Sequence, residues 1–197
     1  MIDKDTILSN WDLSTVPSPC YVLHETLLAD NLRVIDKVRK ATGAEIIVAL
    51  KANAMWSIFP ELSRHSDGAT ASSLAEARLV FEEYGAPASP TSRLGILAAD
   101  LTHLPEGIDG LHFHSLCESR PDDLRGTLAA VEERFGRFFP QIKWLNMGGG
   151  HLMTHKDYDE EELIHILCDF RSRYPHLRII LEPGSAFTWD TGCLVAT

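Results

Sequence analysis

Residues 45–59, EIIVALKANAMWSIF, decide how the rest of the chain is interpreted. Five consecutive apolar residues, 46–50, predict a strand that is buried on both faces, as the strands of parallel sheets are. Lys51 follows directly, at the carboxyl end of this strand. Apolar walls around it would favour the neutral amine, which can attack a carbonyl carbon. The alternative is an ordinary lysine whose ammonium group reaches water from a strand end.

On both sides of this stretch, apolar patterns typical of strands and helices alternate with short connections, which indicates an α/β fold with a parallel sheet or barrel. Strands are expected at residues 20–23, 46–50, 68–71, 94–98, 110–114, 142–146 and 178–182, and helices at 27–38, 56–64, 74–84, 121–135 and 157–170. Residues 193–196 are a further apolar run. About six strands follow the strand-helix pattern, whereas a closed (β/α)8 barrel needs eight. The shortfall falls within residues 85–110, where we find one strand and no helix.

The composition describes a globular chain without a nucleic-acid or membrane surface. Its 197 residues are 45% hydrophobic and carry a net charge of −10, whereas phosphate-rich partners require clustered Lys and Arg. This acidic balance would also favour a polycationic, polyamine-like substrate. Residues 1–10 lack the features of a signal peptide and no apolar run is long enough to span a membrane, so a cytoplasmic protein is expected. Four widely spaced cysteines predict reduced thiols.

Several predicted strands end in residues that can do chemistry. Residues 148–150 are a glycine triplet, which can bring backbone N–H groups close to a phosphate or form a plain tight turn. Glu182 ends another strand, where a solvated carboxylate is the alternative. His112 and His114 alternate with Phe113 and therefore share one face, which fits metal ligands. We expect no metal, because no third ligand stands at a recognisable spacing.

The motifs ALKANAMWS, DGATASSLAEARL, HFHSLCES, NMGGGH and LEPGSA follow one another in this order. Together they resemble the fold-type III pyridoxal phosphate (PLP) decarboxylases, in particular the carboxynorspermidine/carboxyspermidine decarboxylases of polyamine synthesis. The resemblance implies an α/β fold, the (β/α)8 TIM-type barrel of the alanine racemase-like family, here incomplete and without most of its C-terminal β-domain. The domains expected on this basis are an N-terminal segment and strand at 1–24, a PLP-binding barrel at 25–190 that is shortened near 85–110, and the start of the β-domain at 191–197.

The resemblance also implies roles for individual residues. Lys51 corresponds to the Schiff-base lysine, His114 to the histidine that lies against the cofactor ring, and Glu182 to the carboxylate that faces the pyridinium nitrogen. Lys51 and His114 are therefore the expected catalytic residues. The other expected site residues are Gly148, Gly149 and Gly150 as a phosphate loop, Ser115 and Glu118 on the substrate side, and Arg93 and Asp67 as support for the cofactor. For the last two, an ordinary surface ion pair is the alternative.

The implied activity is PLP-dependent decarboxylation of carboxynorspermidine or carboxyspermidine to norspermidine or spermidine, in an active site shared across a homodimer. One departure concerns Ser185, which stands where several relatives place an arginine that holds phosphate. Two alternatives stay open. The first is a related decarboxylase of diaminopimelate, ornithine or arginine. The second is a non-catalytic PLP-binding protein or an inactive fragment of the family, which the short length favours.

Overall fold

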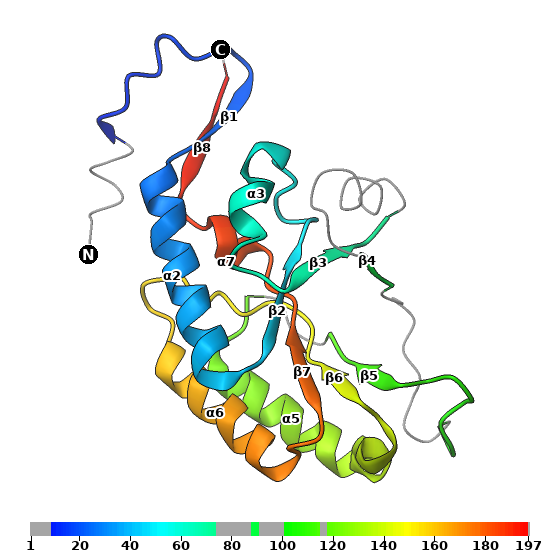
Figure 1. The fold of residues 1–197 in the computed structure, drawn as a ribbon. Helices are drawn as coiled ribbons and strands as arrows, with labels where there is room; N and C mark the ends of the chain where they lie inside the picture. Colours follow the sequence, from blue (N-terminus) through cyan, green and yellow to red (C-terminus); the bar gives the residue numbers. More distant parts are fainter. Residues whose placement is uncertain (1–8, 74–87, 91–100, 115–117, 197) are drawn as a thin grey trace.

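The computed structural model describes residues 9–73, 88–90, 101–114 and 118–196. Six parallel strands form one curled sheet in the order β4-β3-β2-β7-β6-β5 (Figure 1). In chain order they are β2 (Glu45–Ala49), β3 (Gly68–Ala71), β4 (Ala88–Pro90), β5 (Gly110–His112), β6 (Trp144–Asn146) and β7 (Arg178–Leu181). The predicted α/β class and the incomplete barrel of about six strands are confirmed.

The strands that come first and last in this sheet along the chain, β2 and β7, are hydrogen-bonded neighbours. In a closed barrel, a pairing of this kind completes the ring. Here β4 and β5 are the outer strands, and within the described ranges no further strand pairs with them. Among the described residues, the half-barrel is therefore not closed between β4 and β5, in the region where the sequence predicts too few strands. The expected helix at 74–84 and strand at 94–98 lie outside the described residues.

Strand β4 is an element that the sequence does not predict. It contains only Ala88, Ser89 and Pro90, and it pairs with β3 in parallel. Three residues are too few to show an alternating pattern, and a proline within a strand argues for an edge position. The edge position that β4 occupies agrees with that rule.

Three helices lie side by side along the sheet: α2 (Glu25–Thr42), α5 (Pro121–Phe135) and α6 (Glu160–Arg173) (Figure 1). Each carries apolar residues at helical spacing, and this stripe packs into one core with the strands. The buried stripe residues are Leu28, Leu32, Ile35 and Val38 on α2, Leu124 and Leu128 on α5, and Leu163, Ile166, Leu167 and Phe170 on α6. Helix α2 ends before Gly43, which has a φ of 63°, a conformation that glycine adopts without strain.

Strand β2 is buried on both faces, as its apolar run predicts. Ile46 and Val48 are 0% and 2% exposed, and Ile47 and Ala49, which alternate with them, are 8% and 4% exposed. Successive side chains of a strand point to opposite faces, so both faces of β2 are covered. This places the start of the Lys51 segment inside the fold rather than at its edge.

The start of α5 is fixed by Arg120 and Asp123. Arg120 is the N-cap residue, and its backbone N–H donates to the carboxylate of Asp123 at 2.9 Å. Ser119, whose residue type favours a capping role, is instead buried, and its N–H donates to the carbonyl oxygen of Gly150 at 2.7 Å. Ser119 therefore ties the segment before α5 to the glycine loop.

Strands β1 (Cys20–Leu23) and β8 (Gly192–Val195) form a separate two-stranded antiparallel sheet. Tyr21 and Leu194 are direct partners across this pair, and both side chains are exposed. The remaining short elements are η1 (Trp56–Ile58), α3 (Phe59–Leu62), η3 (Gly136–Gln141) and α7 (Ser185–Thr188). Within the described part of the chain, we find no helix with the length and apolar character needed to cross a membrane.

Candidate active site

Lys51 lies in the turn that follows β2, at the carboxyl edge of the sheet. The backbone before it is anchored from two sides: the Ala49 N–H donates to the Pro183 carbonyl at 3.2 Å, and the Leu50 N–H donates to the Thr70 carbonyl at 3.3 Å. Lys51 itself is exposed. The expectation of apolar walls around its amine is therefore wrong for this chain, because burial along β2 and the following turn ends at Leu50.

Gly184 lies against the backbone that leads to Lys51. A Cβ at this position would come within 2.7 Å of the Ala52 Cβ and 2.9 Å of the Ala49 carbonyl oxygen. Contacts this short are not tolerated between a Cβ and backbone, so only glycine lets the loop after β7 approach β2 so closely. The EPG motif, residues 182–184, therefore helps to fix the position of the lysine turn.

Glu182 follows β7 directly and is 6% exposed, which is unusual for a carboxylate. The side-chain amide of Asn146, at the end of β6, donates to Glu182 Oε1 at 2.7 Å. The Glu182 backbone N–H donates to the Gly148 carbonyl at 2.7 Å. The carboxylate is thus held at the carboxyl edge of the sheet by the two residues that flank Met147.

The glycine triplet after β6 forms a close-fitting loop between β5 and β7. The Gly148 N–H donates to Asn146 Oδ1 at 2.9 Å, and the Gly149 N–H donates to His114 Nδ1 at 3.2 Å. Gly148 has a φ of 73°, and a Cβ on Gly149 would lie 2.3 Å from the Glu182 carbonyl oxygen. The glycines are therefore required by the packing itself. Helix α6 begins only at Glu160, so its dipole is too distant to assist the loop.

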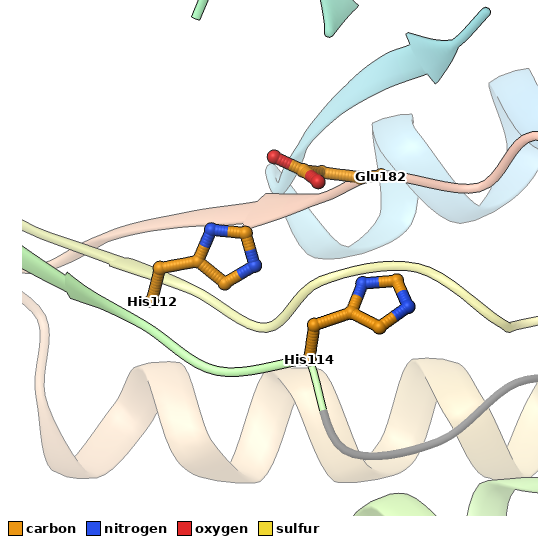
Figure 2. Close-up of side chains that lie close together, drawn as sticks. All are labelled: His112, His114 and Glu182. Carbon is orange, nitrogen blue, oxygen red and sulfur yellow. The ribbon is translucent and has the colours of Figure 1, made fainter. Parts of the chain in front are cut away.

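His112, His114 and Glu182 face one another at this edge, as Figure 2 shows. One ligand-type atom from each side chain lies within 4.8 Å of the others. Burial lowers the pKa of His114 below its ordinary value; the positive charges of Lys51 and His112 lower it further, and Glu182 acts in the opposite direction. The imidazole of His114 is therefore neutral at neutral pH. Because the charge of Lys51 lowers the pKa of His114, the lysine amine interacts electrostatically with this imidazole.

The predicted site residues do not all meet here. Asp67 lies at the opposite, amino edge of the sheet, where its carboxylate accepts from Arg39 Nε at 2.7 Å and from the Ile46 N–H at 2.9 Å. Its prediction as cofactor support is thus not met, and the ion-pair alternative describes it. Glu118 is exposed and adjoins Ser119, which is bonded to the glycine loop. Arg93 and Ser115 lie outside the described residues.

Two residues near the site, Asn146 and His151, are not predicted from the sequence. Asn146 links Glu182 to the glycine loop, and only its position two residues before the glycine triplet could have drawn attention to it. His151, directly after the triplet, is 3% exposed and its Nδ1 lies 3.0 Å from the hydroxyl of Tyr158. Burial lowers the pKa of His151 to about 4, so this histidine is neutral at neutral pH.

No model of a protein family matches the chain. Among characterised proteins, it is 37% identical over 255 residues to the carboxyaminopropylagmatine decarboxylase of Synechocystis sp., a match that covers 97% of this chain and 66% of the relative. It is 30% identical over 244 residues to the carboxynorspermidine/carboxyspermidine decarboxylase of Campylobacter jejuni, with 92% and 64% covered. The chain thus spans slightly less than two thirds of these relatives.

Solved structures give the same result. The crystal structure of carboxynorspermidine decarboxylase from Campylobacter jejuni, complexed with norspermidine, superposes with a TM-score of 0.84 at 30% identity and covers 91% of this chain and 63% of that one. A lysine decarboxylase from Selenomonas ruminantium superposes with a TM-score of 0.66 at 15% identity, which shows the fold alone. The fold is therefore that of the fold-type III decarboxylases.

The sequence identities narrow the assignment from the fold to one family of decarboxylases. The chain belongs to the carboxynorspermidine/carboxyspermidine decarboxylase family. The match to the Synechocystis relative runs over 255 positions, more than the 197 residues of this chain, so the relative has residues inside the matched region that this chain lacks. The missing residues agree with the prediction that the barrel of this chain is shortened internally, near residues 85–110.

Proposed function

We propose that this chain binds PLP through Lys51 and decarboxylates a carboxylated polyamine. The observation that carries the proposal is the convergence of Lys51, His114, Glu182 and residues 148–150 at one edge of the sheet. Each of these groups follows the carboxyl end of a different strand, β2, β5, β7 or β6, which supports the proposal of a shared site. The activity is the one that the Campylobacter relative's name gives for that protein.

The residues present fit the cofactor at two points. Gly148 and Gly149 accept no Cβ, so no side chain separates their backbone from a phosphate. Without the cofactor their N–H groups donate to Asn146 Oδ1 and His114 Nδ1, and a phosphate would replace one or both of these acceptors. Glu182 is a buried carboxylate whose position is fixed by Asn146, which suits a partner for a pyridinium N–H. When bound, PLP supplies an electron sink for the pair of electrons released with CO2.

Each residue then has a distinct task. Lys51, in the anchored turn after β2, would hold the cofactor through its side-chain amine. Glu182, whose carboxylate accepts from the amide of Asn146, would be the partner of the N–H on the cofactor ring. The neutral imidazole of His114 provides a flat surface beside the ring. Arg93 and Ser115 keep their predicted supporting and substrate-facing roles as part of the proposal.

The proposed substrates are carboxynorspermidine, carboxyspermidine and the related carboxyaminopropylagmatine, the last because of the relative with 37% identity. All three carry cationic groups remote from the reacting carbon, and the chain has a net charge of −10. Glu118 is exposed and adjoins Ser119, which is bonded to the glycine loop, and we assign to it the contact with one of these cations. Binding energy from such remote groups can be used to orient the reacting centre.

We further propose that the active unit is a homodimer in the cytoplasm. Lys51 and His114 are exposed at the carboxyl edge of the described sheet, so a second copy could cover the site. The cysteines that the structure describes, Cys20, Cys168 and Cys193, are free thiols, which fits a reducing compartment. Analytical ultracentrifugation with and without PLP tests this point: a single monomeric species under both conditions would contradict it.

A substrate panel tests the activity. Purified chain with PLP is incubated with the three carboxylated polyamines and, separately, with diaminopimelate, ornithine and arginine, and the released CO2 and the product mass are measured. We expect release from the carboxylated polyamines alone. Release from one of the other amino acids instead would assign the chain to a related decarboxylase.

The exposure of Lys51 favours a second candidate, a PLP-binding protein without turnover. An exposed amine retains more contact with water than a closed decarboxylase site allows. Covalent attachment of PLP to Lys51 with no CO2 from any substrate in the panel would establish this second function. Attachment and release together would exclude it.

A further inference from the structure

We propose that His112, His114 and Glu182 bind a divalent transition-metal ion, such as Zn²⁺, when the cofactor is absent. These three side chains point toward one another in Figure 2, and one ligand atom from each lies within 4.8 Å of the others. Two imidazoles and a carboxylate are a ligand set that suits zinc and other first-row divalent ions. This proposal does not rest on the proposed decarboxylase activity.

The sheet explains why these ligands meet although Glu182 is far from the histidines in sequence. His112 is the last residue of β5 and pairs with Asn146 of β6, which in turn pairs with Ile180 of β7. His112 and Glu182 therefore stand on either side of β6 at the same edge. His114, two residues after His112, projects from the same face of the extended segment. The sequence alone offers no third ligand, whereas the parallel register supplies one.

To bind an ion, the ligand atoms of the three side chains must move slightly closer together. Bonds of about 2.0–2.2 Å from zinc to nitrogen and oxygen bring ligand atoms to about 3.3–3.5 Å from one another. His114 is exposed, so its side chain can rotate toward Glu182 without displacing a core residue. Glu182 is already oriented by the Asn146 amide at 2.7 Å, the kind of hydrogen bond that commonly supports a metal-bound carboxylate.

Metal binding would break a hydrogen bond between His114 and the glycine loop. The Gly149 N–H donates to His114 Nδ1 at 3.2 Å, and a neutral imidazole has one nitrogen lone pair to offer. Coordination through Nδ1 replaces this hydrogen bond, and coordination through Nε2 protonates Nδ1 and ends its role as an acceptor. The loop must therefore release His114 when the ion binds. Because the phosphate loop and Glu182 are both affected, metal and PLP compete for the same site.

The site is tested by titrating the cofactor-free full chain with Zn²⁺ in a calorimeter and with Co²⁺ in a spectrophotometer. We expect one ion per chain, and at least tenfold weaker binding in His112→Ala, in His114→Ala and in Glu182→Gln. His165→Ala, which removes an exposed histidine on α6, is the matched control and should bind like the parent. Unchanged affinity and stoichiometry in the His112→Ala/His114→Ala double variant would overturn the proposal.

Two further measurements keep the result independent of folding and of the proposed activity. Circular dichroism of each variant shows whether weaker binding comes from a lost ligand or from a lost fold. If Glu182→Gln does not fold, the Zn²⁺ affinities of His112→Ala and His114→Ala decide whether the proposal holds. Lys51→Ala removes a nearby positive charge and should bind Zn²⁺ at least as tightly as the parent, although it can no longer attach PLP. A tenfold weaker affinity in this variant would contradict the assigned ligand set.

Discussion

The side-chain amide of Asn146 holds the carboxylate of Glu182 at 2.7 Å, and its oxygen accepts the Gly148 N–H at 2.9 Å. Asn146 is 2% exposed, so both hydrogen bonds are shielded from water. One buried amide therefore sets the position of the candidate ring-nitrogen partner and of the candidate phosphate loop at the same time. The two halves of the cofactor site are coupled through this residue.

Asn146→Ala should weaken both halves together. The substitution leaves the buried Glu182 carboxylate without its amide donor, and an unsatisfied buried group of this kind costs about 1–3 kcal/mol of folding free energy. We expect a lower free energy of unfolding in urea and weaker PLP binding in an absorbance titration. Gln141→Ala, which removes an exposed amide on η3, is the control. Equal stability and equal PLP affinity for Asn146→Ala and the parent would contradict the coupling.

Gly184→Ala tests whether the loop after β7 positions the lysine turn. The new Cβ would meet the Ala52 Cβ at 2.7 Å and the Ala49 oxygen at 2.9 Å, and overpacking of this kind costs about 1–3 kcal/mol. Gly126→Ala is the matched control, because nothing lies within 4 Å of its new Cβ and alanine favours the helix by about 1 kcal/mol. Chemical unfolding should therefore shift in opposite directions for the two variants. A shift in the same direction would show that the close approach is unimportant.

Stability should fall with acid through His151. Burial lowers its pKa to about 4 in the folded chain, whereas the ordinary value of 6.5 applies when the chain is unfolded. Between these two values the unfolded chain binds the extra proton, so the contribution of His151 is fully present above pH 6.5 and is lost as the pH falls toward 4. The limiting effect is about 3 kcal/mol.

Urea unfolding at pH 7 and pH 4.5 measures this contribution. Carboxylates also destabilise folded chains in acid, so the informative quantity is the difference between the parent and His151→Gln, which can keep a hydrogen bond to Tyr158 without titrating. We expect a smaller loss of stability in His151→Gln than in the parent. The control His165→Gln changes an exposed histidine and should lose as much as the parent.

The sequence predicts the layout of the fold well because that layout depends on local patterns. The run at residues 46–50 identifies β2, and the apolar spacing along α2 and α6 identifies their buried faces. Strand β4 is missed because three residues carry no period. The capping of α5 depends on Asp123 rather than on Ser119, which the tertiary contact with Gly150 removes from the helix start.

The site is predicted less completely, because tertiary contacts decide it. Lys51, His114, Glu182 and the glycine loop all follow or end predicted strands, and parallel strands bring such ends to one edge. Asp67 precedes its strand and therefore lies at the other edge, where Arg39 pairs with it. Lys51 is exposed although the run before it is buried, and residue patterns around the lysine do not report this change. Asn146 acts only through partners that are distant in sequence.

The proposal that Lys51 holds PLP is tested by locating the covalent bond between the cofactor and the chain. Incubation with PLP, reduction with borohydride and peptide mass spectrometry should place one pyridoxyl group on Lys51, and Lys51→Ala should lose it together with the absorbance band of the bound cofactor. Lys156→Ala, which removes another exposed lysine, should keep both. A pyridoxyl group spread over several lysines, or retained in Lys51→Ala, would contradict the central claim.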